Sequence, residues 1–359
     1  MTKIYLIHLL TLIAFPSISQ VGNQNIKVHY INIGQADATL VEFECGVILV
    51  DAGAQIGSKA HQRLSSERLI NYLNEFFERR EDLKKEISTI LITHNHNDHT
   101  ESLDEIGKYF NVKAIVSTKD YLSKNKDVPK FARSEGAKVK YLNYQEAINY
   151  KPNGLYYQEI DPFDCNGYGP VIKVYSGEVG LKERTEVNGE KFYPSYFSNP
   201  NNNSLVIKVE YGEASFIFTG DLQEKGIEYL AAQYVDYPEL FKSDVYQAGH
   251  HGSHNATDST LLQMIDPKIT VISAGHHSQR GLGTAFDYGH PNKEVIELIN
   301  LWPSMEKRAF PVDQLIFDGE ETNPFNFNIS SKTYCTCWEN NIVIIADPET
   351  GEMWVNNNP

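Results

Sequence analysis

Residues 93–99 read Thr-His-Asn-His-Asn-Asp-His, and they follow directly on the run Glu-Ile-Ser-Thr-Ile-Leu-Ile that ends at Ile92. The run has the composition of a buried strand, whereas the seven residues after it hold three histidines and an aspartate. Neutral imidazole and carboxylate are side chains that bind divalent transition metals. An exposed polar loop accounts for one or two histidines, but the dense pattern H-x-H-x-D-H predicts a metal site.

The spacing within this stretch predicts how its side chains are shared between ions. His94 and His96 alternate in an extended segment, so their side chains point the same way and can meet one ion. Asp98 and His99 stand one register further on and can face a second ion. The stretch by itself therefore predicts up to two neighbouring metal sites.

Three other apolar strands end in side chains of the same kind. F-I-F-T-G-D ends in Asp221, whose carboxylate can bridge two ions, and Q-A-G-H-H-G-S-H carries His250, His251 and His254. L-V-D-A-G places Asp51 where it can orient a ligand histidine. One such aspartate alone is often a helix N-cap, but together the strands predict ligands delivered to a common rim. The candidate metal ligands are His94, His96, Asp98, His99, Asp221, His250 and His251.

The bulk composition is that of a globular protein that carries a strong negative charge. The chain has 359 residues, is 41% apolar and has a formal net charge of −15. Such a surface repels polyphosphates at long range. A small-molecule or phosphodiester substrate is therefore expected, and nucleic acid stays open as a substrate although the charge does not indicate it.

The N-terminus has the pattern of a secretory signal peptide over residues 1–19. One lysine precedes an apolar stretch from Ile4 to Phe15, and Ser17 and Ser19 stand at the offsets that signal peptidase requires before Gln20. The apolar stretch is short for a membrane span. We expect export to the periplasm or the outside, with no transmembrane anchor after cleavage. A buried N-terminal strand or an uncleaved anchor is the alternative.

Export also permits disulfides, but the spacing of the four cysteines does not assign partners. The cysteines are Cys45, Cys165, Cys335 and Cys337. Cys335 and Cys337 would lie on one side of a strand and do not form a C-x-x-C metal motif. Small buried residues are an equally good interpretation of all four.

Periodicity predicts an α/β protein. Strands are expected at 26–33, 38–43, 47–53, 87–92, 114–118, 139–142, 204–211, 214–221, 243–247 and 269–274. Helices are expected at 65–80, 101–110, 127–136, 224–233, 258–265 and 292–301. This interleaving favours two sheets sandwiched by helices over one parallel sheet. Residues 20–311 are expected to form one domain, with loops and short strands over 150–202. Residues 312–359 are expected to form a β-rich C-terminal extension.

The combination of L-V-D-A-G, T-H-N-H-N-D-H, F-T-G-D and G-H-H-G-S resembles the metallo-β-lactamase superfamily of αββα metallohydrolases. More narrowly, the chain is similar to the hydrolase-like domain of ComEC-type competence proteins. The stretches that carry this second resemblance are residues 28–38, 201–207, 250–253 and 288–292. The resemblance covers roughly residues 26–305 and implies an αββα sandwich with a short C-terminal extension.

The resemblance also implies a ligand arrangement. His94 and His96 would hold the first metal, Asp98 the second together with one of the adjacent pair His250 and His251, and Asp221 would bridge. His99 would point to the side of the second metal. The superfamily's usual third histidine on the first metal should lie just before Ser204, but three asparagines, 201–203, stand there. A second departure is Ala36, where the ComEC-like pattern has glycine.

Zinc, as one or two ions, is the expected cofactor, and manganese or iron(II) also suits these ligands. A metal-bound hydroxide would attack a phosphoryl or carbonyl centre. Asp98 would steer the water, while His254 and His290 would stabilise the oxyanion, although each is equally well an ordinary turn or surface histidine. Support for the ligands is expected from Asp51, Asn203 and Ser204.

These features predict an exported metal-dependent hydrolase of phosphodiester bonds. Two alternatives remain: hydrolysis of a lactone, thioester or lactam on the same fold, and a non-catalytic binding protein stabilised by metal. The missing third histidine makes lactam hydrolysis less attractive. Fold does not fix the substrate in this superfamily, and the tyrosine-rich segment 150–202 is expected to supply the pocket wall.

Overall fold

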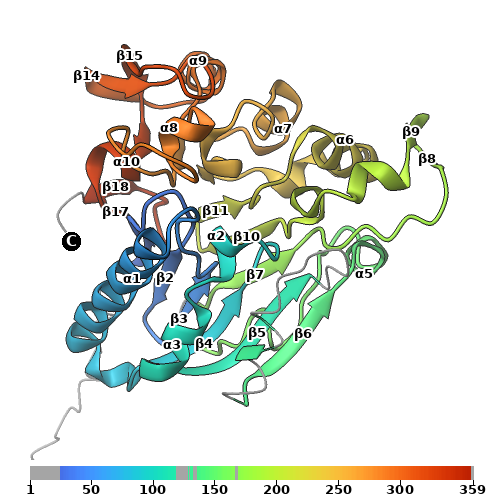
Figure 1. The fold of residues 1–359 in the computed structure, drawn as a ribbon. Coiled ribbons are helices and arrows are strands. Elements are labelled where there is room, and N and C mark those ends of the chain that lie inside the picture. The colour runs from blue at the N-terminus through green and yellow to red at the C-terminus, as the bar shows by residue number, and fades with distance from the viewer. Residues whose placement is uncertain (1–24, 119–127, 129, 132–135, 166–168, 357–359) are drawn as a thin grey trace, which may run out of the picture.

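Two β-sheets lie face to face, and helices cover the outer face of each (Figure 1). The computed structural model describes residues 25–356 apart from 119–127, 129, 132–135 and 166–168. The predicted α/β class and αββα sandwich are confirmed. The predicted signal peptide and most of the helix expected at 127–136 lie outside the described residues.

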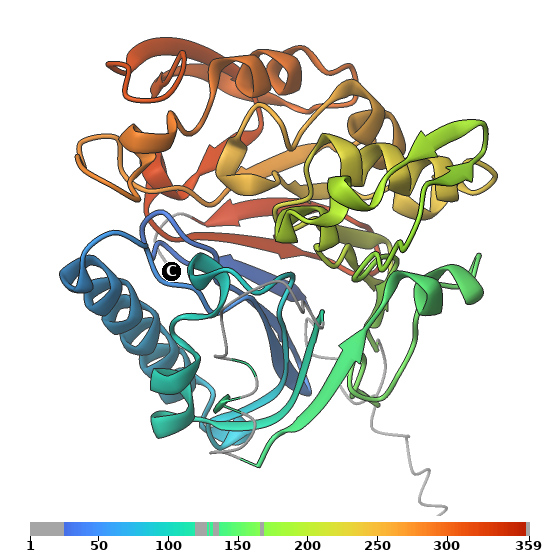
Figure 2. The same ribbon diagram turned by 45° about the vertical axis from the view of Figure 1, so that its right-hand side comes forward.

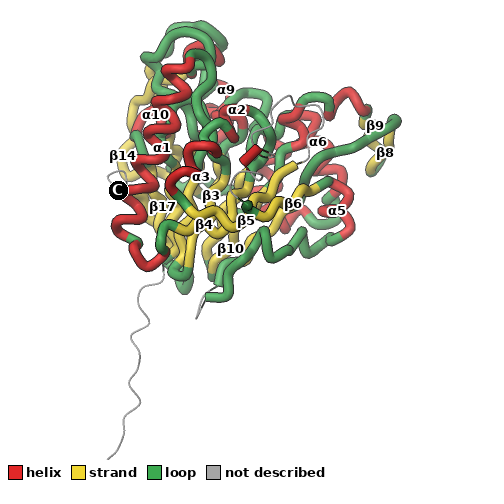
Figure 3. The backbone as a smooth tube through the Cα atoms, turned by 60° about the horizontal axis from the view of Figure 1, so that its bottom comes forward, coloured by secondary structure: helices red, strands yellow, loops and turns green. Residues whose placement is uncertain are grey.

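The first sheet has eight strands in the order β18-β17-β1-β2-β3-β4-β5-β6. Their bounds are β1 (Ile26–Tyr30), β2 (Thr39–Phe43), β3 (Gly46–Val50), β4 (Glu86–Leu91), β5 (Asn111–Thr118), β6 (Lys138–Leu142), β17 (Ile342–Ala346) and β18 (Met353–Asn356). Strands β3 to β6 run parallel. Helices α1 (Lys59–Arg79) and α3 (Leu103–Tyr109) pack on this sheet through an apolar stripe that includes Leu69, Leu73 and Ile106 (Figure 3).

The second sheet has six strands in the order β16-β13-β12-β11-β10-β7. Their bounds are β7 (Val171–Val174), β10 (Ile207–Tyr211), β11 (Ala214–Phe218), β12 (Val245–Gln247), β13 (Ile269–Ile272) and β16 (Thr333–Cys335). Strands β10 and β11 form a hairpin, and Gly212 between them has the positive φ of +60° that the turn requires. Helices α6 (Glu224–Gln233), α7 (Ser259–Ile265) and α9 (Lys293–Leu301) cover the outer face.

The main core lies between the two sheets. Strand residues alternate between faces, so Val28 and Tyr30 of β1 point inward and meet Val209 and Phe216 of the second sheet in one buried cluster. The intervening positions of each sheet pack against the helices. The strands are therefore rigid supports for the loops that follow them.

The C-terminal residues belong to the sandwich itself. Strand β16 pairs with β13 in the second sheet, and β17 pairs with β1 in the first, which Figure 2 shows as red strands among blue and yellow ones. Strands β14 (Lys307–Ile316) and β15 (Phe325–Ser331) form a separate ribbon. The boundary expected after residue 311 thus falls within β14, and strands from residues 312–356 contribute to both sheets.

Shorter elements connect these layers. They are α2 (Asn97–Thr100), α5 (Tyr144–Asn149), β8 (Thr185–Val187), β9 (Glu190–Phe192), α8 (Ala285–Tyr288) and α10 (Thr336–Glu339). Disulfides join Cys45 to Cys165 and Cys335 to Cys337. Cys335 ends β16 and Cys337 already lies in α10, so the two are not on one strand. In the part of the chain that the structure describes, no helix is both long and apolar enough to cross a membrane.

Candidate metal centre

The loops after β1, β3, β4, β11 and β12 meet at one rim of the sandwich. Strands β3 and β4 are parallel, as are β11 and β12, so each pair ends at the same edge. A pocket of about 330 Å³ opens there. Its lining includes His96, Asp98, Asp221, His250, His251 and His290. The structure thus brings together side chains from three of the four predicted strand ends in the pocket, with Asp51 from the fourth behind them.

The histidine stretch after β4 bends at residues 93–95 and brings its side chains to the pocket. His96 is extended and precedes the single helical turn α2. The His94 Nε2 atom lies 3.0 Å from His96 Nδ1 and 3.8 Å from Asp221 Oδ2. Burial holds the pKa of His94 well below its ordinary value, so this imidazole is neutral and can donate a lone pair.

Asp51 orients His99, the last residue of the H-x-H-x-D-H motif. Its Oδ1 accepts the Thr93 backbone N–H at 2.7 Å, and its Oδ2 accepts the Thr93 hydroxyl and the His99 Nδ1–H, both at 2.8 Å. Because Nδ1 is the donor, His99 turns Nε2 toward Asp221 Oδ1, 3.3 Å away. Burial lowers the pKa of His99, but the carboxylates of Asp221 and Asp51 outweigh it and hold that pKa well above 6.5.

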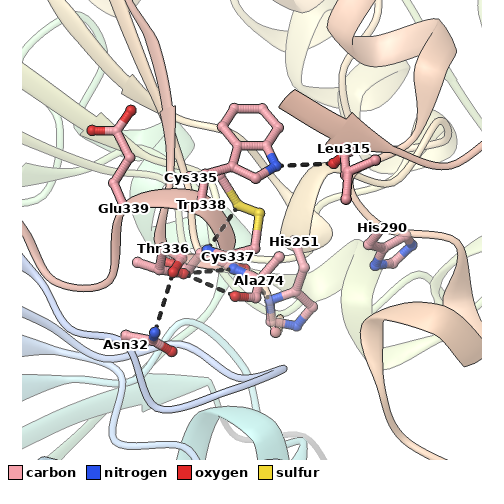
Figure 4. Close-up of a disulfide and its surroundings, with 12 residues drawn as sticks. Asn32, His251, Ala274, His290, Leu315, Cys335, Thr336, Cys337, Trp338 and Glu339 are labelled. Atoms are coloured by element: carbon pink, nitrogen blue, oxygen red, sulfur yellow. Dashed lines mark hydrogen bonds between the residues drawn. A yellow bond between two sulfur atoms is a disulfide. The ribbon is translucent and has the colours of Figure 1, made fainter. Parts of the chain in front are cut away.

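Asp98 and His251 face each other across the pocket. His251 donates Nδ1–H to the carbonyl of Ser273 at 3.0 Å, which leaves Nε2 3.4 Å from Asp98 Oδ2. The neighbouring Ala274 is held in turn by Thr336, whose hydroxyl bonds to both the Ala274 N–H and its carbonyl at 3.0 Å (Figure 4). Thr336 stands within the Cys335–Cys337 disulfide, so the C-terminal segment braces His251 from behind.

Asp37 is a further carboxylate of this cluster that the sequence reasoning missed. It is 4% exposed, and its Oδ2 lies 3.4 Å from His251 Nδ1. Gln247 donates to its Oδ1 at 2.7 Å. Burial raises the pKa of Asp37 to about 6. The signal was present in the Gly-Gln-Ala-Asp turn that contributes to the resemblance, but a turn aspartate has many ordinary uses.

The charges and the unpaired atoms of the cluster fit a divalent cation. The side-chain donors of Asp37, His99, Asp221 and His251 lie within 4.8 Å of one another, as do those of His94, His96 and Asp221. His99 Nε2 and Asp221 Oδ1 are buried and make no hydrogen bond. Burial raises the pKa of Asp221, but His99 and His250 hold it well below its ordinary value. This carboxylate is therefore ionised and is balanced by imidazoles in their charged form, and a bound cation would take over that role when the imidazoles act as neutral ligands.

The residues expected to support the ligands differ in what they contact. Ser204 accepts the Asp221 backbone N–H through Oγ at 3.1 Å. It therefore directly positions Asp221, the residue expected to bridge two ions. Asn203 instead accepts the Val179 N–H at 2.8 Å and donates to the Phe197 carbonyl at 3.0 Å, which braces its own loop. Ala36 fits in place of glycine because the positive φ in this turn falls on Gly34, not on Ala36.

The two candidate oxyanion histidines are placed differently. His290 is 5% exposed and lines the pocket, where Gln35 contacts its Nδ1 at 3.0 Å. His254 is exposed and is not among the lining residues. From the tyrosine-rich segment expected to form the wall, only Asn201 lines this pocket among the described residues, and Tyr288 of α8 supplies the aromatic surface.

Comparisons with known proteins relate this chain to one family. A family model described as the metallo-beta-lactamase superfamily matches residues 31–276. ComE operon protein 3 of Bacillus subtilis (strain 168) is 27% identical over 300 residues, which cover 80% of this chain and 32% of that protein. Competence protein ComA of Neisseria gonorrhoeae is 34% identical over 111 residues, covering 30% of this chain and 14% of that protein.

Among solved structures, the metallo-beta-lactamase fold protein YhfI from Bacillus subtilis matches with a TM-score of 0.41 and 10% identity, covering 85% of this chain and 99% of that one. The chain matches a third or less of the length of the two competence proteins. The resemblance to a ComEC-type domain is confirmed by these relatives. With most of its residues matched by the family model, this chain belongs to the metallo-beta-lactamase superfamily.

Proposed function

We propose that this chain is an exported, metal-dependent hydrolase that cleaves phosphodiester bonds. His94, His96 and Asp221 would hold one ion, and Asp98, His99 and His251 would hold a second that shares Asp221. When bound, such ions lower the pKa of water and polarise a phosphoryl oxygen. Zinc is the proposed ion because histidine and aspartate suit it, and manganese and iron(II) belong in any metal panel.

The openness of the site favours a catalytic over a purely structural role. Structural metal sites are closed by protein ligands, whereas catalytic ones keep a position open to substrate. Here His96, Asp98 and Asp221 all line a pocket that opens to solvent. A substrate can therefore reach the donor atoms directly.

His290 is the observation that best supports a hydrolytic role, because its hydrogen bonding fixes which nitrogen carries the proton. Gln35 accepts the Gly275 N–H through Oε1 at 2.9 Å, so its amide nitrogen faces His290 Nδ1. Nδ1 therefore accepts, and Nε2 carries the proton. Burial holds the pKa of His290 well below 6.5, so the ring stays neutral. The chain thus offers a preorganised N–H donor for a developing oxyanion or leaving oxygen.

The charge around the pocket favours a diester over a monoester. The described lining residues include no lysine or arginine, which are the usual partners of a doubly charged phosphate. A diester brings one negative charge and requires less compensation. The net charge of −15 favours a small or short phosphodiester over polymeric DNA. Export rests on the sequence of residues 1–19.

Hydrolysis assays on purified, metal-loaded protein test this proposal. We expect cleavage of bis-p-nitrophenyl phosphate, with p-nitrophenyl phosphate, single-stranded DNA, nitrocefin and a thioester as comparison substrates. Asp221→Asn should abolish the activity, whereas His276→Ala, which changes an exposed histidine away from the pocket, should not. Equal activity of Asp221→Asn and the unmodified protein, or turnover of nitrocefin or thioester alone, would reject a phosphodiesterase.

A further inference from the structure

We infer that His250 supplies the third imidazole of the first metal site, so that the adjacent pair His250 and His251 is divided between the two ions. In this arrangement a histidine after β12 compensates for the histidine missing before Ser204. The inference rests on metal binding at the proposed site, and it assigns a ligand that neither the motif order nor the family pattern assigns.

The two oxygens of Asp221 face two different groups of imidazoles. Oδ2 lies 3.8 Å from His94 Nε2 and 3.7 Å from His250 Nε2. Oδ1 lies 3.3 Å from His99 Nε2. These distances are too long for good hydrogen bonds to Oδ2, yet they leave His94 and His250 around the same oxygen. His250 therefore stands on the side of His94, not on the side of His99.

His251 belongs to the opposite group. Its Nε2 lies 3.4 Å from Asp98 Oδ2, and its donors cluster with those of Asp37, His99 and Asp221. The rings of His250 and His251 are 6.1 Å apart between centroids. Two imidazoles adjacent in sequence thus belong to different groups of donor atoms.

The hydrogen bonds of His250 leave the correct nitrogen available. Its Nδ1 lies 3.1 Å from Asn255 Oδ1, which can only accept, and 3.3 Å from Gln223 Nε2. We assign the proton to Nδ1 from the shorter contact. Nε2 then carries a lone pair, which lies 3.5 Å from the Asn201 amide nitrogen and 3.7 Å from Asp221 Oδ2. A cation between Nε2 and the carboxylate would relieve the repulsion between them.

If His250 binds the first metal, the side chain next to it must be small enough to leave room for the imidazole. Asn201 occupies that neighbouring position. Its Nδ2 is 3.5 Å from His250 Nε2, and its Oδ1 is buried without a hydrogen-bond partner. A histidine in the 201–203 turn would compete with His250 for the space beside Asp221. The shorter asparagine leaves that space to the imidazole from the opposite loop.

The backbone of the pair is held in a conformation that serves this division. His250 and His251 have φ of +50° and +55°, a region of the backbone that is strained for residues other than glycine. The His250 N–H donates to the Gly220 carbonyl at 3.1 Å, next to Asp221, and the Asn292 N–H holds the Gly252 carbonyl at 2.9 Å. Strain retained at two consecutive residues is typical of functional sites.

Metal stoichiometry in paired variants tests the inference without using activity. Apo protein would be titrated with Zn²⁺ by calorimetry, and bound metal counted after desalting. We expect the unmodified protein and His276→Ala to hold two ions. His250→Ala should weaken one of them at least about 100-fold. The double variant His94→Ala/His250→Ala should still hold one ion, whereas His250→Ala/His251→Ala should hold none tightly.

Full affinity for two ions in His250→Ala, or one tightly held ion in His250→Ala/His251→Ala, would overturn the inference. X-ray absorption at the zinc edge gives an independent count, because His250→Ala should lower the mean number of imidazoles per zinc. Circular dichroism of each apo variant checks folding, and His250→Gln replaces His250→Ala if the latter does not fold. A protein that distributes metal as expected but leaves diesters uncut rejects the proposed function alone.

Discussion

Asp51 accepts the Nδ1–H of His99 at 2.8 Å, and this single hydrogen bond turns the other ring nitrogen toward Asp221. The same carboxylate holds the backbone and hydroxyl of Thr93, at the exact point where β4 gives way to the histidine stretch. Asp51 itself has a φ of +60° immediately after β3. The residue therefore fixes both His99 and the loop that carries three more candidate ligands, His94, His96 and Asp98.

Replacing Asp51 by asparagine should weaken metal binding without unfolding the protein. Asparagine has one oxygen for three donors, so His99 loses either its orientation or its partner. We expect metal affinity to fall about 10- to 100-fold, as for other residues that orient ligands. Calorimetric titration of Asp51→Asn beside the exposed Asp313→Asn measures this. Equal affinities in the two variants would show that Asp51 does not orient His99.

Gln35 should control catalysis through His290. In Gln35→Glu the carboxylate would accept a hydrogen bond from Nδ1–H, so the neutral ring would carry its single proton on Nδ1 and Nε2 would become an acceptor. We expect kcat on bis-p-nitrophenyl phosphate to fall about 100-fold, the range for loss of one oxyanion donor, with little change in metal content. Gln35→Met, which removes the hydrogen bond without reversing it, should lose less. A larger loss in Gln35→Met would contradict control by the proton position.

Gly53 is required because the backbone of residues 98 and 99 lies against its Cα, and not because its φ is unusual. A Cβ at this position would lie 1.7 Å from the Asp98 carbonyl oxygen and 2.9 Å from the His99 N. Gly53→Ala should push the β3 loop away from the ligands and lower both thermal stability and metal affinity. Gly180→Ala is the matched control because nothing lies within 4 Å of its added Cβ. Comparable melting temperatures for the two variants would rule out this steric role.

Glu42 should make stability depend on acid pH away from the metal site. Burial raises its pKa, but His29, Lys27 and Arg80 lower it to about 2 from 4.5. Burial also lowers the pKa of His29, so Lys27 and Arg80 supply the lasting positive charge. A carboxyl with a depressed pKa stabilises the fold above its unfolded value, and this stability is lost as pH falls from 4.5 toward 2.

Urea unfolding at several pH values measures that contribution. We expect Glu42→Gln to lose on the order of 2 kcal/mol at pH 7 and the difference from the unmodified protein to shrink below pH 4.5. Glu67→Gln changes an exposed carboxylate that is paired with Arg63 on the same helix surface and should cost almost nothing. A Glu42→Gln deficit that stays constant down to pH 2 would contradict the ionic origin of the effect.

The strand ends were predictable because each ligand follows an apolar run whose period is visible in the sequence. Thr93 to His99, Asp221 and the pair after β12 all lie where those runs stop, and the fold brings them to one edge. The resemblance to the metallo-β-lactamase superfamily also predicted the order of the layers, with two sheets between helices. Helix α6 was expected at the residues it occupies because its apolar spacing and flanking turns are unambiguous.

The remaining features depend on contacts between segments far apart in the sequence. The sequence of β17 is a short apolar run that does not reveal its partner strand. Its pairing with β1 could therefore not be predicted, and the C-terminal residues were expected to form an extension. Asp37 gains its role only when β12 delivers His251 beside it. The division of His250 and His251 depends on two positive φ angles, which local sequence does not favour in histidine.

Anomalous diffraction from crystals grown with Zn²⁺ or Mn²⁺ is the most direct test of the metal centre. We expect two peaks that share Asp221: one between its Oδ2 and the imidazoles of His94 and His96, the other beside Asp98, His99 and His251. Crystals of Asp221→Asn grown in the same metal should lose at least one peak. An absence of peaks among these residues at saturating metal, or peaks only at surface histidines, would contradict a metal-dependent site.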